Sequence, residues 1–207
     1  MKILLRIDCS SRKDGSHSRK LADVFEKNWK LANENGKIIY RDLAAFEVPH
    51  ISNDTIEAFY TPENNLTLKQ KEALLISDEF INELYAADEI LISSPLYNLN
   101  VPSSLKAYFD QVVRPNKTFS TQDNGTIVGM LAQKVAHLVL VKGGFYENTV
   151  LEPFDFQKPY LEAILQFIGI SVRNVFSLEG TSTSEGNDKR FDSIQTKIQE
   201  TFKYIIQ

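Results

Sequence analysis

Residues 89–113, EILISSPLYNLNVPSSLKAYFDQVV, join an apolar run to an amphipathic segment through a loop that contains two prolines. The run EILISS at 89–94 has a continuously apolar centre, which is typical of a strand buried on both faces of a parallel sheet. The segment 103–113 has an apolar face at helical spacing, formed by Leu105, Tyr108, Phe109 and Val112. Pro115 follows it and favours an end to the helix. The stretch therefore predicts a strand–loop–helix unit of an α/β fold.

The same alternation of strand-like and helix-like runs continues along the chain. Strands are predicted at 2–7, 36–43, 89–94, 134–141 and 170–179. Helices are predicted at 17–33, 66–88, 103–113, 159–169 and 187–205, the second beginning at or beside Thr67. Parallel neighbours need crossover connections, which are usually helices. We therefore expect a single domain over residues 1–207, with a doubly wound five-stranded parallel sheet in order 2-1-3-4-5 and helices on both faces.

Composition and charge exclude several classes of protein. The chain has 207 residues, of which 43% are hydrophobic and 24% charged, as expected of one globular domain. The net charge of -4 and the lack of a Lys/Arg-rich block argue against a nucleic-acid partner. No apolar stretch approaches the roughly 20 residues that span a bilayer, so no membrane partner is expected. One cysteine and three widely separated histidines predict neither a disulfide nor a metal site, and a cytoplasmic protein is expected.

The loop DCSSRKDGSHS at 8–18 lies between the first predicted strand and the first predicted helix. Its hydroxyl groups and the free N–H groups of a helix start suit a phosphate, which the helix dipole also favours. A serine-rich turn with a simple helix cap is the alternative interpretation. The loop contains neither the P-loop pattern nor G-x-G-x-x-G, so a mononucleotide phosphate is the remaining nucleotide hypothesis.

Two further loops follow the third and fourth predicted strands. Pro95 and Pro102 stiffen the ends of the first of these loops, and the residues between them alternate apolar bulk with amide groups. A planar heteroaromatic ligand needs that combination, although these side chains would also serve to plug the end of the sheet. Gly143 and Gly144 in the second loop permit close approach of a ligand to the backbone, or simply a turn. In the predicted strand order all three loops meet at the topological switch point.

The motifs SS…GSHS, SPLYNLNVPSSLKAYFDQVVR at 94–114 and GG after the fourth strand resemble those of a known family. This is the flavodoxin-like family of FMN-dependent NADH-azoreductases, also described as FMN-dependent NADH:quinone oxidoreductases. The segments LTLKQKEALLISDEFINEL, KTFSTQDNG and FIGI are also similar, so the resemblance covers essentially the whole chain. It implies one FMN per subunit, bound near the interface of a homodimer.

The resemblance also implies which residues bind the cofactor. The phosphate and ribityl chain would be held by Ser10, Ser16, His17 and Ser18. The isoalloxazine ring would be lined by the loop residues Pro95, Leu96, Tyr97, Asn98 and Leu99, and its pyrimidine side bordered by Val141, Lys142, Gly143 and Gly144. By the same resemblance, we would expect a glutamine at the position of His17, an arginine at that of Lys142 and a histidine at that of Tyr146. These differences concern substrate preference more than the fold.

The leading functional hypothesis is a ping-pong oxidoreductase. NADH or NADPH would reduce the FMN and leave, and a quinone or an aromatic azo compound would then take two electrons in the same crevice. No catalytic acid, base or metal ligand is predicted, and Cys9 is interpreted as a small buried residue. One alternative is a non-enzymatic electron carrier of flavodoxin type. The other, a flavin-free regulatory module of receiver type, would need an acidic pocket that this sequence lacks.

Overall fold

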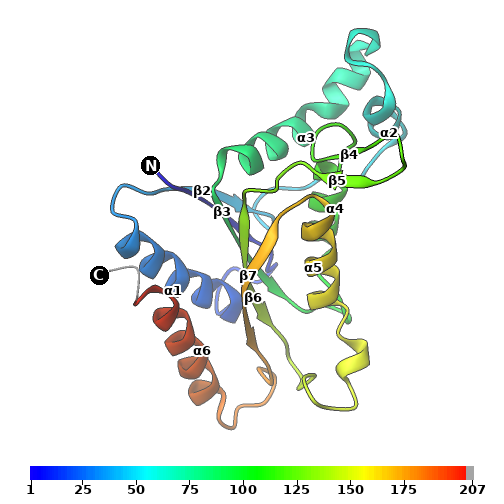
Figure 1. Cartoon of the computed structure of the whole chain (residues 1–207). Helices are drawn as coiled ribbons and strands as arrows, with labels where there is room; N and C mark the ends of the chain where they lie inside the picture. The colour runs from blue at the N-terminus through cyan, green and yellow to red at the C-terminus, as the bar shows by residue number, and fades with distance from the viewer. Residues whose placement is uncertain (204–207) are drawn as a thin grey trace.

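A five-stranded parallel sheet forms the centre of the chain in the computed structural model, which describes residues 1–203 (Figure 1). Its order is β2-β1-β3-β6-β7, and every neighbouring pair is parallel. The strands are β1 (Ile3–Asp8), β2 (Lys37–Asp42), β3 (Glu89–Pro95), β6 (Val135–Val141) and β7 (Ser171–Leu178). Their carboxyl ends point towards the lower part of Figure 1, where the loops after β6 and β7 extend.

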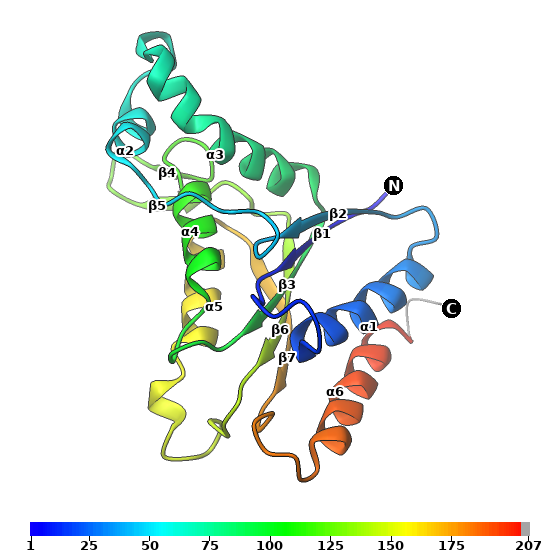
Figure 2. The same cartoon turned by 180° about the vertical axis from the view of Figure 1, so that it is seen from behind.

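Helices cover both faces of the sheet (Figures 1 and 2). Alternate residues of each strand point to opposite faces, so Leu4 packs in one buried cluster and Leu5 in the other. The face of Leu4 is covered by α1 (His17–Ala32) and α6 (Asn187–Phe202). The face of Leu5 is covered by α3 (Leu68–Ala86), α4 (Ser103–Val112) and α5 (Gln157–Phe167).

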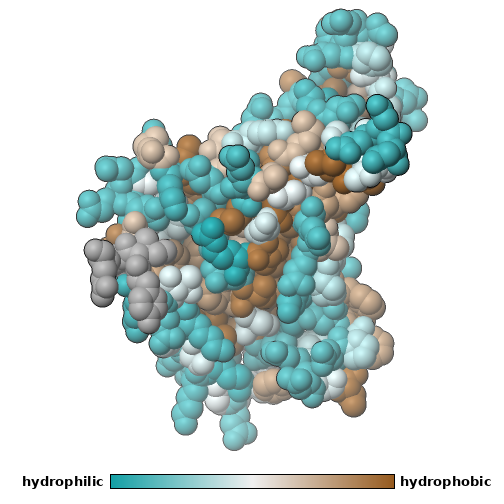
Figure 3. Space-filling view, in the orientation of Figure 1, coloured by the Kyte–Doolittle hydropathy of each residue, from teal (hydrophilic) through white to brown (hydrophobic). Residues whose placement is uncertain are grey.

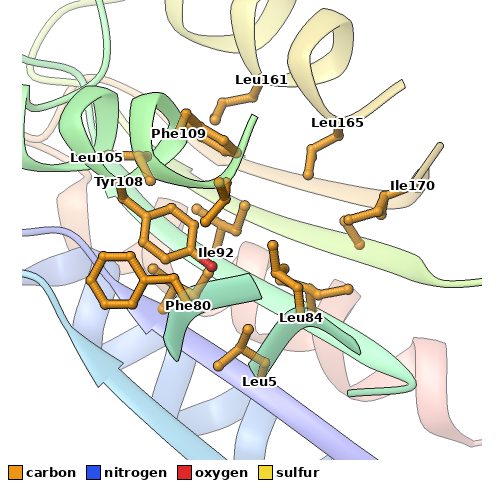
Figure 4. Close-up of a cluster of buried hydrophobic side chains, with 14 of the residues drawn as sticks. Leu5, Phe80, Leu84, Ile92, Leu105, Tyr108, Phe109, Leu161, Leu165 and Ile170 are labelled. Carbon is orange, nitrogen blue, oxygen red and sulfur yellow. The ribbon is translucent and has the colours of Figure 1, made fainter. Parts of the chain in front are cut away.

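The larger of the two buried clusters lies between the sheet and helices α3, α4 and α5 (Figure 4). Phe80 of α3 and Tyr108 of α4 pack ring against ring, with centroids 4.9 Å apart. Leu161 and Leu165 of α5 extend the cluster, and neither exposes more than 1% of its surface. Burial of such side chains stabilises a fold by about 1.5–3 kcal/mol each, so the apolar periodicity of these helices fixes which face meets the sheet.

The start of α3 follows a capping residue in the sequence. The hydroxyl of Thr67 accepts a hydrogen bond from Gln70 N, and Gln70 Oε1 accepts one in return from Thr67 N. This capping box confirms the predicted start of α3. The last predicted helix is present as α6, and its predicted end at Ile205 lies outside the described residues.

Several short elements lie in the long connections and were not predicted. The connection after β2 contains α2 (Asn53–Tyr60) and the 3-10 turn η1 (Glu63–Asn65), and a second turn, η2 (Glu152–Phe154), precedes α5. The strands β4 (Phe119–Thr121) and β5 (Ile127–Gly129) form an antiparallel hairpin apart from the main sheet. The flavodoxin-like α/β sheet is therefore confirmed, while the predicted order matches only roughly, because it did not allow for these two strands.

Seen from the side of Figure 1, hydrophobic residues gather near the middle of the surface (Figure 3). They lie where the edge strand β7 runs between the layer of α1 and α6 and the layer of α5. None of the helices in residues 1–203 is long and apolar enough to cross a membrane.

Candidate functional site

A cavity of about 470 Å³ opens at the carboxyl edge of the sheet. Its volume lies within the range of about 300–1,000 Å³ that is usual for small-molecule sites. Four loops, which follow β1, β3, β6 and β7, contribute to it. The lining residues are Ser10, Arg12, Gly15, Ser16, His17, Ser18, Pro95, Leu96, Tyr97, Val141, Gly143, Thr181 and Ser182.

The serine side of the cavity is built on the start of α1. Ser16 caps this helix, its hydroxyl accepting from Arg19 N at 3.4 Å, and lies 3.2 Å from the hydroxyl of Ser18. Ser10 Oγ accepts a hydrogen bond from Arg12 N at 3.3 Å, two residues further along the same loop. The first N–H groups of a helix lack acceptors within the helix, so this end is suited to an anion.

Arg19 holds the loop of residues 8–18 in place. Its guanidinium donates to both carboxylate oxygens of Asp42, at 2.8 and 2.7 Å, and to Ser10 O at 2.8 Å. The hydrogen bonds from Arg19 hold the pKa of Asp42 below its ordinary value. Asp8, at the end of β1, is buried and accepts from Ser93 Oγ at 2.6 Å. The serine loop is therefore held in place by a partly buried charge network and not by its own turn alone.

His17 is the first residue of α1 and lines the same cavity. Its Nδ1 atom is buried and has no hydrogen-bond partner among residues 1–203. Burial lowers the pKa of His17, and the nearby cations Lys20 and Arg12 lower it further, while Asp188 of α6 opposes them. Because water cannot reach this nitrogen, it is not exposed to the cavity, and other atoms of His17 line the opening.

The wall after β3 ends in a tight turn. Leu96 N donates to Val141 O at 2.7 Å, which continues the pairing of β3 with β6 past the strand ends. Tyr97 and Asn100 then exchange two backbone hydrogen bonds, of 2.8 and 3.0 Å, around Asn98 and Leu99. Both central residues have positive φ, 48° and 71°. Positive φ is uncommon for asparagine and unfavourable for leucine, so this turn holds backbone strain.

Directly after β6, the side chain of Lys142 points into the protein interior. Lys142 is 3% exposed, and its Nζ lies 2.5 Å from Asp155 Oδ2 and 2.8 Å from Glu179 Oε1. Burial lowers the pKa of Lys142, but the hydrogen bonds to both carboxylates outweigh that effect and raise it above its ordinary value. Gly143 faces the cavity, and a Cβ there would come within 2.6 Å of Ser182 Oγ. A larger residue there would require the Ser182 hydroxyl to rotate away.

Of the residues predicted from sequence, nine line the cavity together: Ser10, Ser16, His17, Ser18, Pro95, Leu96, Tyr97, Val141 and Gly143. Four are not among its lining residues: Asn98, Leu99, Lys142 and Gly144. Asn98 and Leu99 form the turn beyond Tyr97, and Lys142 points into an ion cluster. Their roles towards a ligand stay predictions.

Sequence reasoning missed four lining residues, Arg12, Gly15, Thr181 and Ser182. Thr181 and Ser182 belong to the hydroxyl-rich run GTSTSEG at 180–186, directly after the last strand. The carboxyl end of that strand lies at the same edge of the sheet as the other loops. That position and composition together were the signal that would have identified it.

Cys9 lies at the end of β1 and is fully buried. Burial raises the pKa of its thiol well above the ordinary value, and Asp8 adds to that effect. The thiolate is the reactive form of cysteine, so this side chain is a packed apolar group. No group of three or more potential metal-binding side chains occurs within residues 1–203.

The cavity therefore combines two kinds of surface. One end has three serine hydroxyls and the start of a helix, both suited to a phosphate, and the His17 side chain lies beside them. The other has Pro95, Leu96, Tyr97 and a glycine, suited to a flat ring. These residues fit a phosphorylated planar cofactor such as FMN.

Comparison with known proteins identifies the family of the chain. A family profile for the flavodoxin-like fold matches residues 1–202. An FMN-dependent NADH:quinone oxidoreductase of Marinomonas sp. (strain MWYL1) is 37% identical over 198 residues, which cover 96% of this chain and 98% of that protein. One of the same name from Xanthobacter autotrophicus (strain ATCC BAA-1158 / Py2) is 46% identical over 82% of each chain.

Solved structures show the same fold. An azoreductase from Bacillus anthracis str. Sterne superposes with a TM-score of 0.91 and 23% identity, covering 99% of this chain and 100% of that one. An FMN-dependent NADH-azoreductase from Bacillus anthracis str. Ames Ancestor, solved in complex with FMN, gives a TM-score of 0.88 at 24% identity and full coverage of both chains.

Proposed function

The chain belongs to the flavodoxin-like family of FMN-dependent NADH:quinone oxidoreductases, and on that premise we propose that it reduces quinones and aromatic azo compounds with NADH or NADPH. The observation that carries the proposal is the cavity, in which a phosphate-binding end and a flat apolar wall meet at the switch point of the sheet. We also propose that the chain is a single FMN-binding domain over residues 1–207.

The residues of the first loop would hold the FMN phosphate. Ser10, Ser16 and Ser18 offer hydroxyl donors, and the start of α1 offers N–H groups and the positive end of a helix dipole. Because Arg19 anchors Ser10 O and Ser16 caps the helix, these donors are fixed before a ligand arrives. A site fixed in advance loses less conformational entropy on binding.

The loops after β3 and β6 would hold the ring. Leu96 and Tyr97 supply apolar contact, and the amide of Asn98 stands next to them in the turn. The N–H groups of Leu96 and Tyr97 already donate to Val141 O and Asn100 O. Of residues 96–99, the backbone N–H groups of Asn98 and Leu99 would therefore offset negative charge on the reduced ring, as fixed dipoles do at developing anions. Gly143 lets the backbone approach the opposite side.

When bound, FMN would supply the two-electron redox chemistry. We propose a ping-pong order, in which the nicotinamide nucleotide and the acceptor occupy the same space in turn. The loops after four strands share this cavity, and both reactants would approach a ring bound there. No side chain is assigned as a catalytic acid or base.

We also propose a homodimer in the cytoplasm. A groove of about 330 Å³ runs between α2, α4 and α5 and is lined largely by apolar residues, among them Ile56, Phe109, Tyr160 and Phe167. Apolar surface of this kind is typical of protein–protein contacts. Sedimentation of the purified chain at several concentrations would test the dimer.

The visible spectrum of the purified protein tests the enzymatic proposal. After addition of FMN and removal of free flavin, we expect flavin bands that NADH bleaches without oxygen and that a quinone then restores. Absence of bound flavin would refute the proposal. Bands that neither NADH nor NADPH bleaches would instead favour an electron carrier.

A further inference from the structure

A second cavity, of about 850 Å³, lies between α2, the turn η1, the amino-terminal part of α3 and the loop after α4. We call it the α2–α3 cavity. It shares no lining residue with the cavity at the carboxyl edge of the sheet. In Figures 1 and 2, α2 lies at the upper end of the molecule, away from the loops after β6 and β7. The function proposed above gives this cavity no role.

Arg114, in the loop after α4, is the buried cation of the α2–α3 cavity. It is 6% exposed, and its Nη1 donates to Asp78 Oδ1 at 2.6 Å and to Ser77 Oγ at 3.4 Å. The central carbon of the guanidinium lies 5.3 Å from the centre of the Phe59 ring. These contacts hold the guanidinium in one orientation before any ligand binds.

The other edge of this guanidinium is free. Within residues 1–203, Nε and Nη2 of Arg114 make no hydrogen bond, yet neither is among the polar atoms that are sealed from water without a partner. Water therefore reaches both atoms, and Arg114 lines the α2–α3 cavity. The Nε and Nη2 groups of an arginine form one of the two edges that bind a carboxylate through two parallel hydrogen bonds.

The charges on the wall of the α2–α3 cavity favour one negative group. Three cations line it, Arg114, Lys71 and Lys117. The two anions are Glu63 and Asp78, and Asp78 already pairs with Arg114. The lining therefore carries one net positive charge, although the chain as a whole carries -4. A single carboxylate would balance it.

Much of the remaining wall is apolar. Phe59 and Leu74 are 8% and 2% exposed, and Leu66 packs against the buried cluster that they form. Leu75 is 64% exposed at the same cavity. The volume is far larger than a carboxylate group needs and lies in the range of sites for small organic ligands. A ligand that fills it therefore needs an apolar body, and the Phe59 ring favours an aromatic one.

We propose that the α2–α3 cavity binds an aromatic carboxylate, whose carboxylate group accepts from Nε and Nη2 of Arg114 and whose ring lies against Phe59 and the leucines. The site is separate from the cavity proposed for FMN, so the inference does not rest on the proposed function.

Calorimetric titration with biphenyl-4-carboxylate tests the site. The neutral biphenyl-4-carboxamide has nearly the same shape and is the matched ligand. The carboxylate is expected to bind with a dissociation constant of about 1 mM or below, as usual for a ligand of this size. It is expected to bind at least about tenfold more tightly than the amide, because hydrogen bonds between charged groups are the stronger ones. Each titration is run with and without FMN.

Two exposed residues of the wall give variants that do not disturb the core. Lys71→Gln should weaken binding of the carboxylate about two- to fivefold, and Glu63→Gln should strengthen it by a similar factor, as expected for single exposed charges. Lys69→Gln is the matched control, because Lys69 lies on the same helix but pairs with Asp54 and does not line the cavity. It should leave the affinity unchanged.

Arg114→Lys keeps the positive charge and removes the two parallel N–H groups. It should weaken binding of the carboxylate at least about fivefold, and binding of the amide much less. If Arg114→Lys does not fold, the opposite responses of Glu63→Gln and Lys71→Gln still decide the question.

The outcomes separate this inference from the proposed function. No binding of the carboxylate at about 1 mM, equal affinity for carboxylate and amide, or unchanged affinity in both Glu63→Gln and Lys71→Gln would overturn it. Displacement of the carboxylate by FMN would also overturn it, because the ligand would then occupy the other cavity. A chain that binds no FMN would end the proposed function and leave this inference standing, since the titration without FMN makes the same comparison.

Discussion

Removal of the buried amine of Lys142 is expected to destabilise the fold strongly. Lys142→Met keeps most of the side-chain volume and leaves Asp155 and Glu179 without their shared cation. The Lys142 side chain is 4% exposed and each carboxylate 12%, so water can screen little of the loss. Since the pKa of Lys142 lies above its ordinary value, its stabilising contribution is fully present at neutral pH and is lost only as pH rises through that pKa.

The size of the loss in stability depends on the hydrogen bonds that Asp155 and Glu179 keep after Lys142 is replaced. Removing one partner of a buried ion pair typically costs about 3–5 kcal/mol. Here Glu179 Oε2 still accepts from Tyr146 N at 2.7 Å and Glu147 N at 3.1 Å, and Asp155 Oδ1 still accepts from Gln157 N. These hydrogen bonds soften the loss, so we expect the lower end, about 3 kcal/mol. That is a large part of a typical stability of about 5–15 kcal/mol.

Urea unfolding followed by circular dichroism measures the change. Lys106→Met is the matched control, because Lys106 makes an exposed pair with Asp110 of the kind worth about 0–1 kcal/mol. Adding Asp155→Asn and Glu179→Gln to Lys142→Met should recover part of the loss, since no buried charge then remains. If Lys142→Met and Lys106→Met unfold within about 0.5 kcal/mol of each other, a resolution typical of such comparisons, the ion cluster does not stabilise the fold as argued.

Three further changes test other parts of the structure. Hydrogen bonds from His137 and Lys2 outweigh the effect of burial and lower the pKa of Glu89 to about 2. The stability of the fold should therefore fall as pH drops from 4.5 towards 2, and it should fall less in Glu89→Gln. Acid unfolding followed by fluorescence measures this. Asn98→Gly should weaken FMN binding about three- to tenfold in a fluorescence titration, through loss of one hydrogen bond worth about 0.5–1.5 kcal/mol. Gly129→Ala should lower thermal stability by about 1–3 kcal/mol, because its Cβ would lie 2.1 Å from Gly169 N.

Each of these changes has a control in the same chain. Asn98 has φ 48°, a conformation that glycine adopts freely. Asn98→Gly therefore removes the side-chain amide without adding backbone strain, whereas Asn98→Ala removes the amide and adds strain. Unchanged FMN affinity in both variants would remove Asn98 from the proposed site. Gly125→Ala, in the same hairpin, meets no atom within 4 Å and bears only the strain of its positive φ. Equal losses of thermal stability in Gly129→Ala and Gly125→Ala would argue against a close contact at Gly129. If Glu89→Gln and the wild type unfold identically as pH falls, Glu89 is not the source of the acid sensitivity.

The main sheet and its covering helices were predictable because their signals are long. The apolar runs at 89–94 and 134–141 correspond to strands buried on both faces, and Thr67 marked the start of α3. The hairpin of β4 and β5 gave no such signal, since its strands have three residues each and none of these residues is fully buried. Such short elements depend on contacts from distant parts of the chain, such as Leu131 N to Ile168 O.

The candidate site was predictable to the level of loops but not of side-chain direction. The strand order alone brings the loops after β1, β3 and β6 to one edge, so most of the predicted residues line one cavity. Lys142 could not be assigned this way. Its two partners lie 13 and 37 positions along the chain, and neither spacing is visible as a pattern in sequence.

The turn at Tyr97–Asn100 has a consequence for how this chain would respond to selection. Leu99 adopts φ 71°, where a glycine would fit the backbone better by roughly 1 kcal/mol. A library randomised at position 99 and screened only for heat resistance should therefore drift towards glycine. The same library screened for turnover should keep a large apolar side chain if Leu99 serves the site. The two screens would separate what the fold prefers from what the chemistry demands.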